Sequence, residues 1–147
     1  MDLRTPINLR EAIARDYPAC ARIYAEAWNE ALPEIPRSIS TKAFQNEISG
    51  ELVFVAAIGK RIAGYISVWK PDWFIHHLYV SPQAQRTGIG TVLLDHIVEM
   101  AHSNPVSLKV QTKNFMAAKF YESAGFHQTR ERGRDEYGEW IRLIKTA

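Results

Sequence analysis

The chain has 147 residues, of which 46% are hydrophobic and 23% are charged, with a formal net charge of +2. This length predicts one domain, residues 1–147. The small, dispersed charge argues against nucleic acid and membrane surfaces as partners, and we expect neither a signal peptide nor a membrane span. Cys20 is the only cysteine, so no intramolecular disulfide is expected and a cytoplasmic location is the default.

The first fifty residues predict one strand and two helices. Ile7–Ala12 alternates apolar and polar residues, which is typical of a strand. The helical spacing of the apolar residues that follow predicts a helix after an Asp16 cap. A second, short helix is expected over 42–49, with Ser40 or Thr41 as its cap.

Three consecutive strands are expected next. The segment 51–70 predicts a hairpin with a tight turn at Gly59 and Lys60. Trp73–Val80 is rich in aromatic and β-branched residues, which favours a third strand. Because the links between these strands are short, we expect the three to be antiparallel.

After Gly88 the apolar pattern changes to a period of 3.6 and predicts a helix that runs to Asn104. Val106–Val110 is again rich in β-branched residues. The order strand, helix, strand implies a parallel crossover connection.

The end of the chain predicts a helix capped by Asn114 and two strands, from Phe126 to about Arg130 and over Tyr137–Ile144. Gly133 is expected in the turn between these strands. The basic run Arg130 to Arg134 is therefore interpreted as a solvated turn. Together the elements predict an α+β domain on a mixed sheet.

The segment "QRTGIGT", residues 85–91, places two glycines at the head of a predicted helix. A helix start has free amides and a partial positive charge. Without Cβ atoms at Gly88 and Gly90, the amides of 86–91 are predicted to wrap an oxyanion, with added charge from Arg86. The alternative is a tight strand-to-helix turn. The P-loop and Rossmann patterns are both excluded, the latter because Leu93 replaces the third glycine.

Two motifs carry a resemblance to a known family. Gln85, Gly88 and Gly90 form Q-x-x-G-x-G between a strand and a helix, and "NFMAAKFYESAGF" downstream has the pattern N-x-x-A-x-x-x-Y-x-x-x-G-F. In their order and spacing they resemble the GCN5-related N-acetyltransferase (GNAT) superfamily. The element order matches over nearly the whole chain, whereas the first 70 residues match only in pattern. The second motif comprises Asn114, Ala117, Tyr121, Gly125 and Phe126.

The resemblance implies a mixed, mostly antiparallel seven-stranded sheet flanked by four helices, with splayed parallel fourth and fifth strands. It implies acetyl-CoA as the acetyl-donor cosubstrate, with its pantetheine arm paired to a strand edge whose amide serves as the oxyanion hole. The cofactor-binding residues that it implies are Leu78, Tyr79, Val80, Gln85, Arg86, Thr87, Gly88, Ile89, Gly90, Thr91, Asn114 and Tyr121.

For catalysis, Tyr121 matches the family's usual general acid, with a packed helix aromatic as the alternative. Family bases lie on the strand before the loop, where His76 is the candidate base and His77 the alternative. Strict alternation predicts that these two point to opposite faces. No metal is expected, because His76, His77 and His96 have no cysteine or carboxylate at ligand spacing.

The acceptor is expected against the first helix, the loop after it and the last hairpin, with Trp28, Glu30, Trp73 and Tyr79 as candidate substrate residues. Core packing and a solvated helix face are the alternatives for these side chains. The implied reaction moves acetyl directly to a primary amine of a small molecule, in a ternary complex without an acetyl-enzyme. The alternatives are acetylation of a protein N-terminus or lysine, and a coenzyme A sensor without turnover. Family habit suggests a homodimer.

Overall fold

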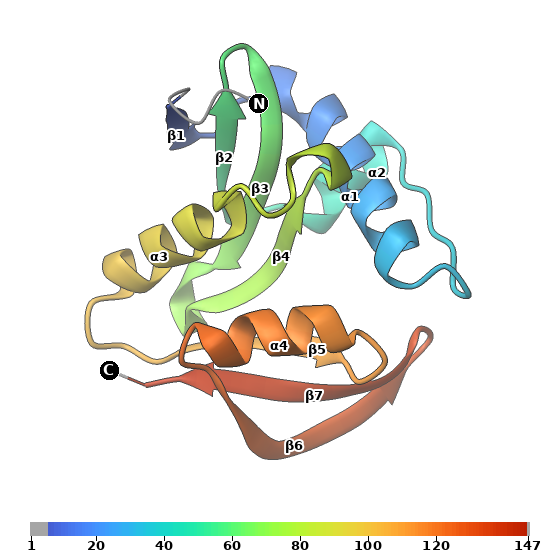
Figure 1. Ribbon diagram of the computed structural model, residues 1–147, viewed down its shortest axis with the longest axis vertical. Helices are drawn as coiled ribbons and strands as arrows, with labels where there is room; N and C mark the ends of the chain where they lie inside the picture. The colour runs from blue at the N-terminus through green and yellow to red at the C-terminus, as the bar shows by residue number, and fades with distance from the viewer. Residues whose placement is uncertain (1–5, 147) are drawn as a thin grey trace.

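The computed structural model describes residues 6–146, which form a seven-stranded mixed sheet in the order β1-β2-β3-β4-β5-β7-β6, flanked by four α-helices (Figure 1). The predicted α+β architecture is therefore confirmed. No helix in this part of the chain is long and apolar enough to cross a membrane. The strands are β1 (Ile7–Glu11), β2 (Leu52–Ile58), β3 (Arg61–Trp69), β4 (Phe74–Val80), β5 (Val106–Gln111), β6 (His127–Asp135) and β7 (Gly138–Lys145). The helices are α1 (Tyr17–Ala31), α2 (Thr41–Glu47), α3 (Ile89–Ala101) and α4 (Phe115–Ser123).

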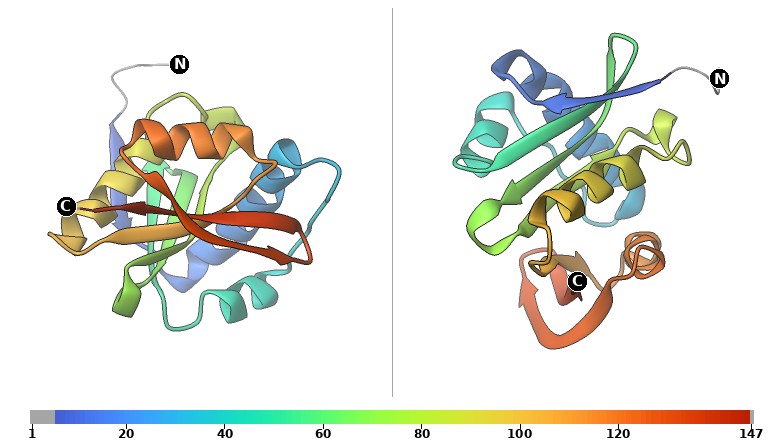
Figure 2. Two further views of the ribbon diagram at one scale, coloured as in Figure 1. Left: turned by 90° about the horizontal axis from the view of Figure 1, so that it is seen from below. Right: turned by 90° about the vertical axis from the view of Figure 1, so that its left-hand side faces the viewer.

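The helices cover both faces of the sheet, α1 and α2 on one and α3 and α4 on the other (Figure 2). Alternation along β2 and β3 supplies each face with its own apolar side chains. Val55 and Tyr65 pack in a cluster with α1 and α2, whereas Ala56 and Ile66 pack in a second cluster with α3 and α4. The sheet therefore separates two buried cores.

The parallel pairing of β4 with β5 is short. It joins Phe74 to Ser107 and Ile75 to Leu108, and β4 then continues to Val80 without β5 beside it. On its other edge β4 stays paired with β3 as far as Val80. The predicted splaying is confirmed, and one edge of β4 is left with backbone groups that no strand pairs.

The last hairpin differs from the prediction. The basic run Arg130 to Arg134 lies inside β6, not in a turn, and Gly133 stands opposite Trp140 of β7. A Cβ at Gly133 would overlap the Trp140 ring, so the glycine allows close packing within the hairpin. Two salt bridges offset positive charge in this hairpin. Arg134 pairs with Glu139 at 2.7 Å, and Arg142 pairs with Glu131 at 3.1 Å.

Asp16 stands at the N-cap position of α1, as predicted, but its side chain makes no capping hydrogen bond because the carboxylate is paired with Arg10 of β1. Arg10 donates to it twice, Nη1 to Oδ2 at 2.7 Å and Nη2 to Oδ1 at 2.9 Å, and the Ile13 amide donates at 2.8 Å. These donors lower the pKa of the Asp16 carboxyl, with the hydrogen bond from Arg10 as the main cause. Asp16 thus fastens the start of α1 to the end of β1.

Asp16→Asn should lower the free energy of unfolding at pH 7 by about 1–3 kcal/mol, since it removes charge-assisted bonds to a buried carboxylate. Because the folded pKa lies below the unfolded value of about 3.9, this stabilisation is present above that value and is lost as the pH falls through the folded pKa. Urea unfolding at pH values from 7 down to 3 measures the difference. The exposed-site control Asp72→Asn should change stability by less than about 0.5 kcal/mol, and a pH-independent effect of Asp16→Asn would contradict the assignment.

Candidate active site

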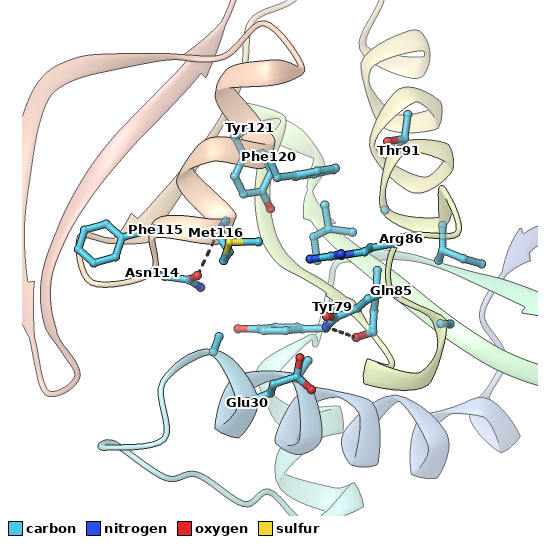
Figure 3. A pocket seen from close by; sticks show the side chains of 18 of the residues that line it. Glu30, Tyr79, Gln85, Arg86, Thr91, Asn114, Phe115, Met116, Phe120 and Tyr121 are labelled. Carbon is cyan, nitrogen blue, oxygen red and sulfur yellow. Dashed lines mark hydrogen bonds between the residues drawn. The ribbon is translucent and has the colours of Figure 1, made fainter.

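A cavity of about 700 Å³ opens where β4 leaves β5 (Figure 3). Its walls come from the unpaired part of β4, the β4–α3 connection, the start of α4 and the end of α1. Every residue predicted to bind the cofactor lines it except Thr87, whose hydroxyl donates to the Ala84 carbonyl instead. The two sequence motifs, about thirty residues apart, thus meet at one cavity.

The start of α3 presents free backbone amides to this cavity. Among residues 6–146, the first amide of the helix with a backbone acceptor is that of Val92, which donates to the Gly88 carbonyl at 3.0 Å. Gly88 has a left-handed φ of 87°, and Arg86, two residues earlier, has a φ of 66°. Such a φ costs energy outside glycine and tends to occur at functional sites. The arrangement is suited to an anion.

The two glycines of the loop serve different purposes. A Cβ at Gly88 would meet nothing within 4 Å, so this position faces open space. A Cβ at Gly90 would lie 3.3 Å from the Phe120 ring and 3.7 Å from Val80. The prediction that both glycines clear space for an oxyanion therefore fits Gly88, whereas Gly90 lets α3 pack closely against α4.

α4 contributes Tyr121, whose hydroxyl points into the cavity (Figure 3). The residue is 7% exposed, and its ring packs against Phe120 and Phe126. Burial raises the pKa of the Tyr121 phenol, so it stays protonated at neutral pH and can donate a proton. The side chain of Asn114 accepts from the Ala117 amide at 3.2 Å and caps α4, as predicted.

Sequence reasoning missed other lining residues at the start of α4. Phe115 and Met116 are 77% and 70% exposed, which is unusual for large apolar side chains. Lys113 lies just before them and, with Arg86, gives the cavity two cationic side chains. The signal was present, since all three stand beside Asn114 in the second motif. The cavity thus combines apolar surface with positive charge.

The prediction that His76 and His77 point to opposite faces was wrong. The pairing of β3 with β4 shifts register here, so that Ser67 faces His77 and Val68 faces Ile75, with His76 as the extra residue. Such a bulge re-aims side chains. The two imidazole rings lie 4.3 Å apart, and neither lines the cavity.

Both histidines are held by glutamates of the α2 region. His76 Nδ1 lies 2.8 Å from Glu51 Oε2, and this bond raises the pKa of His76. His77 Nε2 lies 3.1 Å from Glu47 Oε1, while burial lowers the pKa of His77. These glutamates lie 25 to 30 residues away from the histidines in sequence, so the search for a carboxylate at ligand spacing did not find them.

The predicted acceptor residues separate into two groups. Glu30 and Tyr79 line the cavity, whereas Trp28 and Trp73 do not. Trp73 instead lines a second cavity with residues of β5, β6 and β7. Trp28 donates from Nε1 to the Ile35 carbonyl at 2.7 Å and so shapes the α1–α2 connection.

Trp28 also takes part in a bridge of side chains between the α1–α2 connection and the β6–β7 hairpin. Its ring meets that of Tyr137, in the β6–β7 turn, at 5.1 Å with an interplanar angle of 70°. The guanidinium of Arg37 lies over both rings, 5.1 Å and 4.2 Å from their centroids. The α1–α2 connection and the last hairpin are thus joined beside the gap between β4 and β5.

Comparison with known proteins identifies the family. Residues 23–146 match the family model described as an acetyltransferase (GNAT) domain, and the chain belongs to this family. It is an acetyl-CoA-dependent N-acetyltransferase with an amine acceptor, so a coenzyme A sensor without turnover is not retained.

Two curated proteins are similar to this chain in sequence. The peptidyl-lysine N-acetyltransferase YiaC of Escherichia coli is 27% identical over 131 residues, which cover 81% of this chain and 82% of that one. The N-alpha-acetyltransferase RimI of Mycobacterium tuberculosis is 28% identical over 137 residues, covering 88% and 84%.

Solved structures confirm the fold. A GCN5-related N-acetyltransferase from Rhodopseudomonas palustris superposes with a TM-score of 0.82 at 21% identity, covering 100% of this chain and 99% of that one. The PaiA N-acetyltransferase of Thermoplasma acidophilum, solved in complex with coenzyme A, has a TM-score of 0.80 at 19% identity, covering 97% and 99%.

The cavity has the chemistry that acetyl-CoA requires. The free amides at the start of α3, with Arg86 and Lys113, suit its phosphates. The exposed Phe115 and Met116 offer apolar contact, and the unpaired edge of β4 offers hydrogen bonds to the amides of pantetheine. The residues present therefore fit this cosubstrate.

Gly88→Val should weaken coenzyme A binding at least about tenfold, because it places a branched side chain in the open space before the α3 amides and strains a positive φ. Isothermal titration calorimetry measures the affinity. Gly59→Val is the matched control: its φ is 62° and its Cβ also meets nothing within 4 Å, but it lies in the β2–β3 turn. The control should lose similar stability and keep its affinity, and equal affinities in both variants would refute a cofactor role for this loop.

Proposed function

We propose that the protein transfers the acetyl group of acetyl-CoA directly to a primary amine of a small molecule, in a ternary complex and without an acetyl-enzyme. The observation that carries this proposal is the Tyr121 hydroxyl, which faces the same cavity as the unpaired edge of β4. A proton donor and a hydrogen-bonding strand edge are the two groups that a held thioester needs.

In this proposal the diphosphate of coenzyme A binds the amides at the start of α3, with Arg86 beside it. The pantetheine arm lies along Leu78–Val80, and one amide of this edge donates to the thioester oxygen as charge develops there. This placement is supported by the amides at the start of α3, which have no backbone acceptor among the described residues, and by the edge of β4 that β5 does not pair. Asn114 contacts the arm through the amide nitrogen that its capping bond leaves free.

The chemical step joins the amine nitrogen to the thioester carbon and breaks the carbon–sulfur bond. The amine attacks in its neutral form, after its ammonium has given a proton to water. Tyr121 gives its phenolic proton to the departing sulfur, the nitrogen of the new amide loses its extra proton to water, and the tyrosinate regains a proton from water. Because burial raises the pKa of the Tyr121 phenol, the side chain carries this proton at neutral pH, before the sulfur begins to leave. We assign the base to neither His76 nor His77, because both lie outside the cavity and are bound to glutamates.

Direct transfer is supported by the position of the only cysteine. Cys20 is 0% exposed in α1 and does not line the cavity. Burial raises the pKa of its thiol to about 12, so almost no thiolate exists at neutral pH to accept an acetyl group.

The part of the cavity formed by α1 favours a small cationic amine as the acceptor. The exposed carboxylate of Glu30 lines the cavity and points into it (Figure 3), where it attracts an ammonium group. Trp28, Arg37 and Tyr137 join the α1–α2 connection to the last hairpin, and we infer that this contact leaves less room there for an extended peptide than for a small amine. The second candidate acceptor is a peptide lysine or N-terminus, which the names of the two sequence relatives favour.

A thiol-release assay over a matched panel tests the acceptor. The panel holds diamines and polyamines, aromatic primary amines, lysine-containing peptides with blocked N-termini, and peptides with free N-termini and no lysine. We expect kcat/KM for the best small amine to exceed that for every peptide at least about tenfold, a difference of about 1.4 kcal/mol in transition-state stabilisation. The opposite ranking would establish the peptide acceptor.

Tyr121→Phe should lower kcat about 100-fold, the lower end of what a positioned acid contributes, and leave coenzyme A affinity within about twofold. Stopped-flow thiol release and calorimetry measure the two quantities. Tyr17→Phe is the matched control, because Tyr17 packs on Phe44 away from the cavity and its loss should leave kcat unchanged. An unaltered kcat in Tyr121→Phe would remove Tyr121 as the acid.

A further inference from the structure

A second group of chemically reactive side chains lies outside the cavity, where α2 meets β4. Glu47, His76 and His77 each turn a potential ligand atom toward the others, and these three atoms lie within 4.8 Å of one another. The bulge at His76 makes this possible, since it places two consecutive side chains on one side of the strand. We propose that this group is a binding site for a divalent transition metal ion, zinc by preference.

The spacing suits a tetrahedral ion. Bonds of about 2.0–2.1 Å place ligand atoms roughly 3.3 Å apart around zinc. Glu47 Oε1 lies 3.1 Å from His77 Nε2 and 3.9 Å from His76 Nε2, distances that bracket this value. The side chains of His76 and Glu47 are 33% and 28% exposed, so they are free to close on an ion and leave it open to a water ligand.

Both imidazoles are already oriented as metal ligands usually are. A ligating histidine holds its second ring nitrogen with a carboxylate or another polar group. His76 Nδ1 is bonded to Glu51 Oε2 at 2.8 Å, and His77 Nδ1 to the Tyr65 hydroxyl at 2.9 Å. Because Nδ1 is engaged on both rings, both Nε2 atoms face Glu47, and the Tyr65 hydroxyl can accept from His77 Nδ1–H once Nε2 binds a metal.

The negative charge around His76 and His77 also favours a bound cation. Glu47 and Glu51 bring two carboxylates to a site with two histidines. The Glu51 side chain is 9% exposed, and its Oε1 has no hydrogen-bond partner among the described residues. A buried carboxylate oxygen without a partner is costly, and a divalent ion nearby offsets that negative charge.

The nature of the ligands selects the metal. Two imidazoles and one carboxylate suit zinc, and less well the hard cations magnesium and calcium, which prefer oxygen ligands. The three ligands join the last turn of α2 to the middle of β4. Since none of them lines the acetyl-CoA cavity, the ion would stabilise the packing of α2 on the sheet without taking part in acetyl transfer.

Titration of the full chain with zinc chloride tests the site, with any affinity tag removed and the protein first dialysed against a chelator. Calorimetry, without acetyl-CoA or an amine, should show one zinc per chain with a dissociation constant at or below about 1 µM. Zinc should also raise the thermal unfolding midpoint, as any ligand of the folded state does, and magnesium should do neither.

Two variants at half-exposed positions, His76→Gln and Glu47→Gln, should each weaken zinc binding at least about tenfold while far-UV circular dichroism shows an unchanged fold. His127→Gln is the matched control, because His127 lies on β6, away from the group, and should bind as the unaltered protein does. No one-to-one binding, or equal affinity in all three variants, would overturn the proposal. Acetyl transfer has no part in these measurements, so they stand independently of the proposed acceptor.

Discussion

β4 and β5 exchange backbone hydrogen bonds only around Phe74 and Ile75 before they part in the middle of the sheet. Backbone amides and carbonyls in a protein interior need partners, so a sheet opened at its centre needs some other occupant. The cavity that follows is bordered by the loose edge of β4, the free start of α3 and Tyr121 of α4. In the function proposed above, the amide groups of the pantetheine arm pair with this edge of β4 in place of a strand.

The parts of the structure that the sequence predicted are those that depend on local chemistry. The turn at Gly59 and Lys60, the helical period after Gly88 and the cap at Asn114 each arise from neighbours in the chain. The seven-residue spacing of Asn114 and Tyr121 also places them on one helix face and at one cavity. Both motifs lie on such elements, so most of the residues that line the cavity were predictable.

What could not be predicted depends on contacts between distant segments. The alternation of β4 gives no sign of the register shift at His76, because a bulge belongs to the pairing of two strands. Glu47 and Glu51 reach the histidines only after α2 has packed against β4. Gly133 likewise indicates a turn until Trp140 is placed opposite it. In each case the deciding partner is remote in sequence.

The separation of the two buried clusters has a consequence for how such a protein diverges. α3 and α4, which carry the amides before Val92 and Tyr121, are anchored in one cluster, and α1, which carries Glu30, is anchored in the other. A substitution on the buried face of α1 therefore repacks the cluster on its own side of the sheet, to which neither α3 nor α4 belongs. In the function proposed above, acceptor binding then depends on one core and cofactor binding on the other, so the acceptor can change in duplicated copies of such a chain through mutations in the α1 cluster.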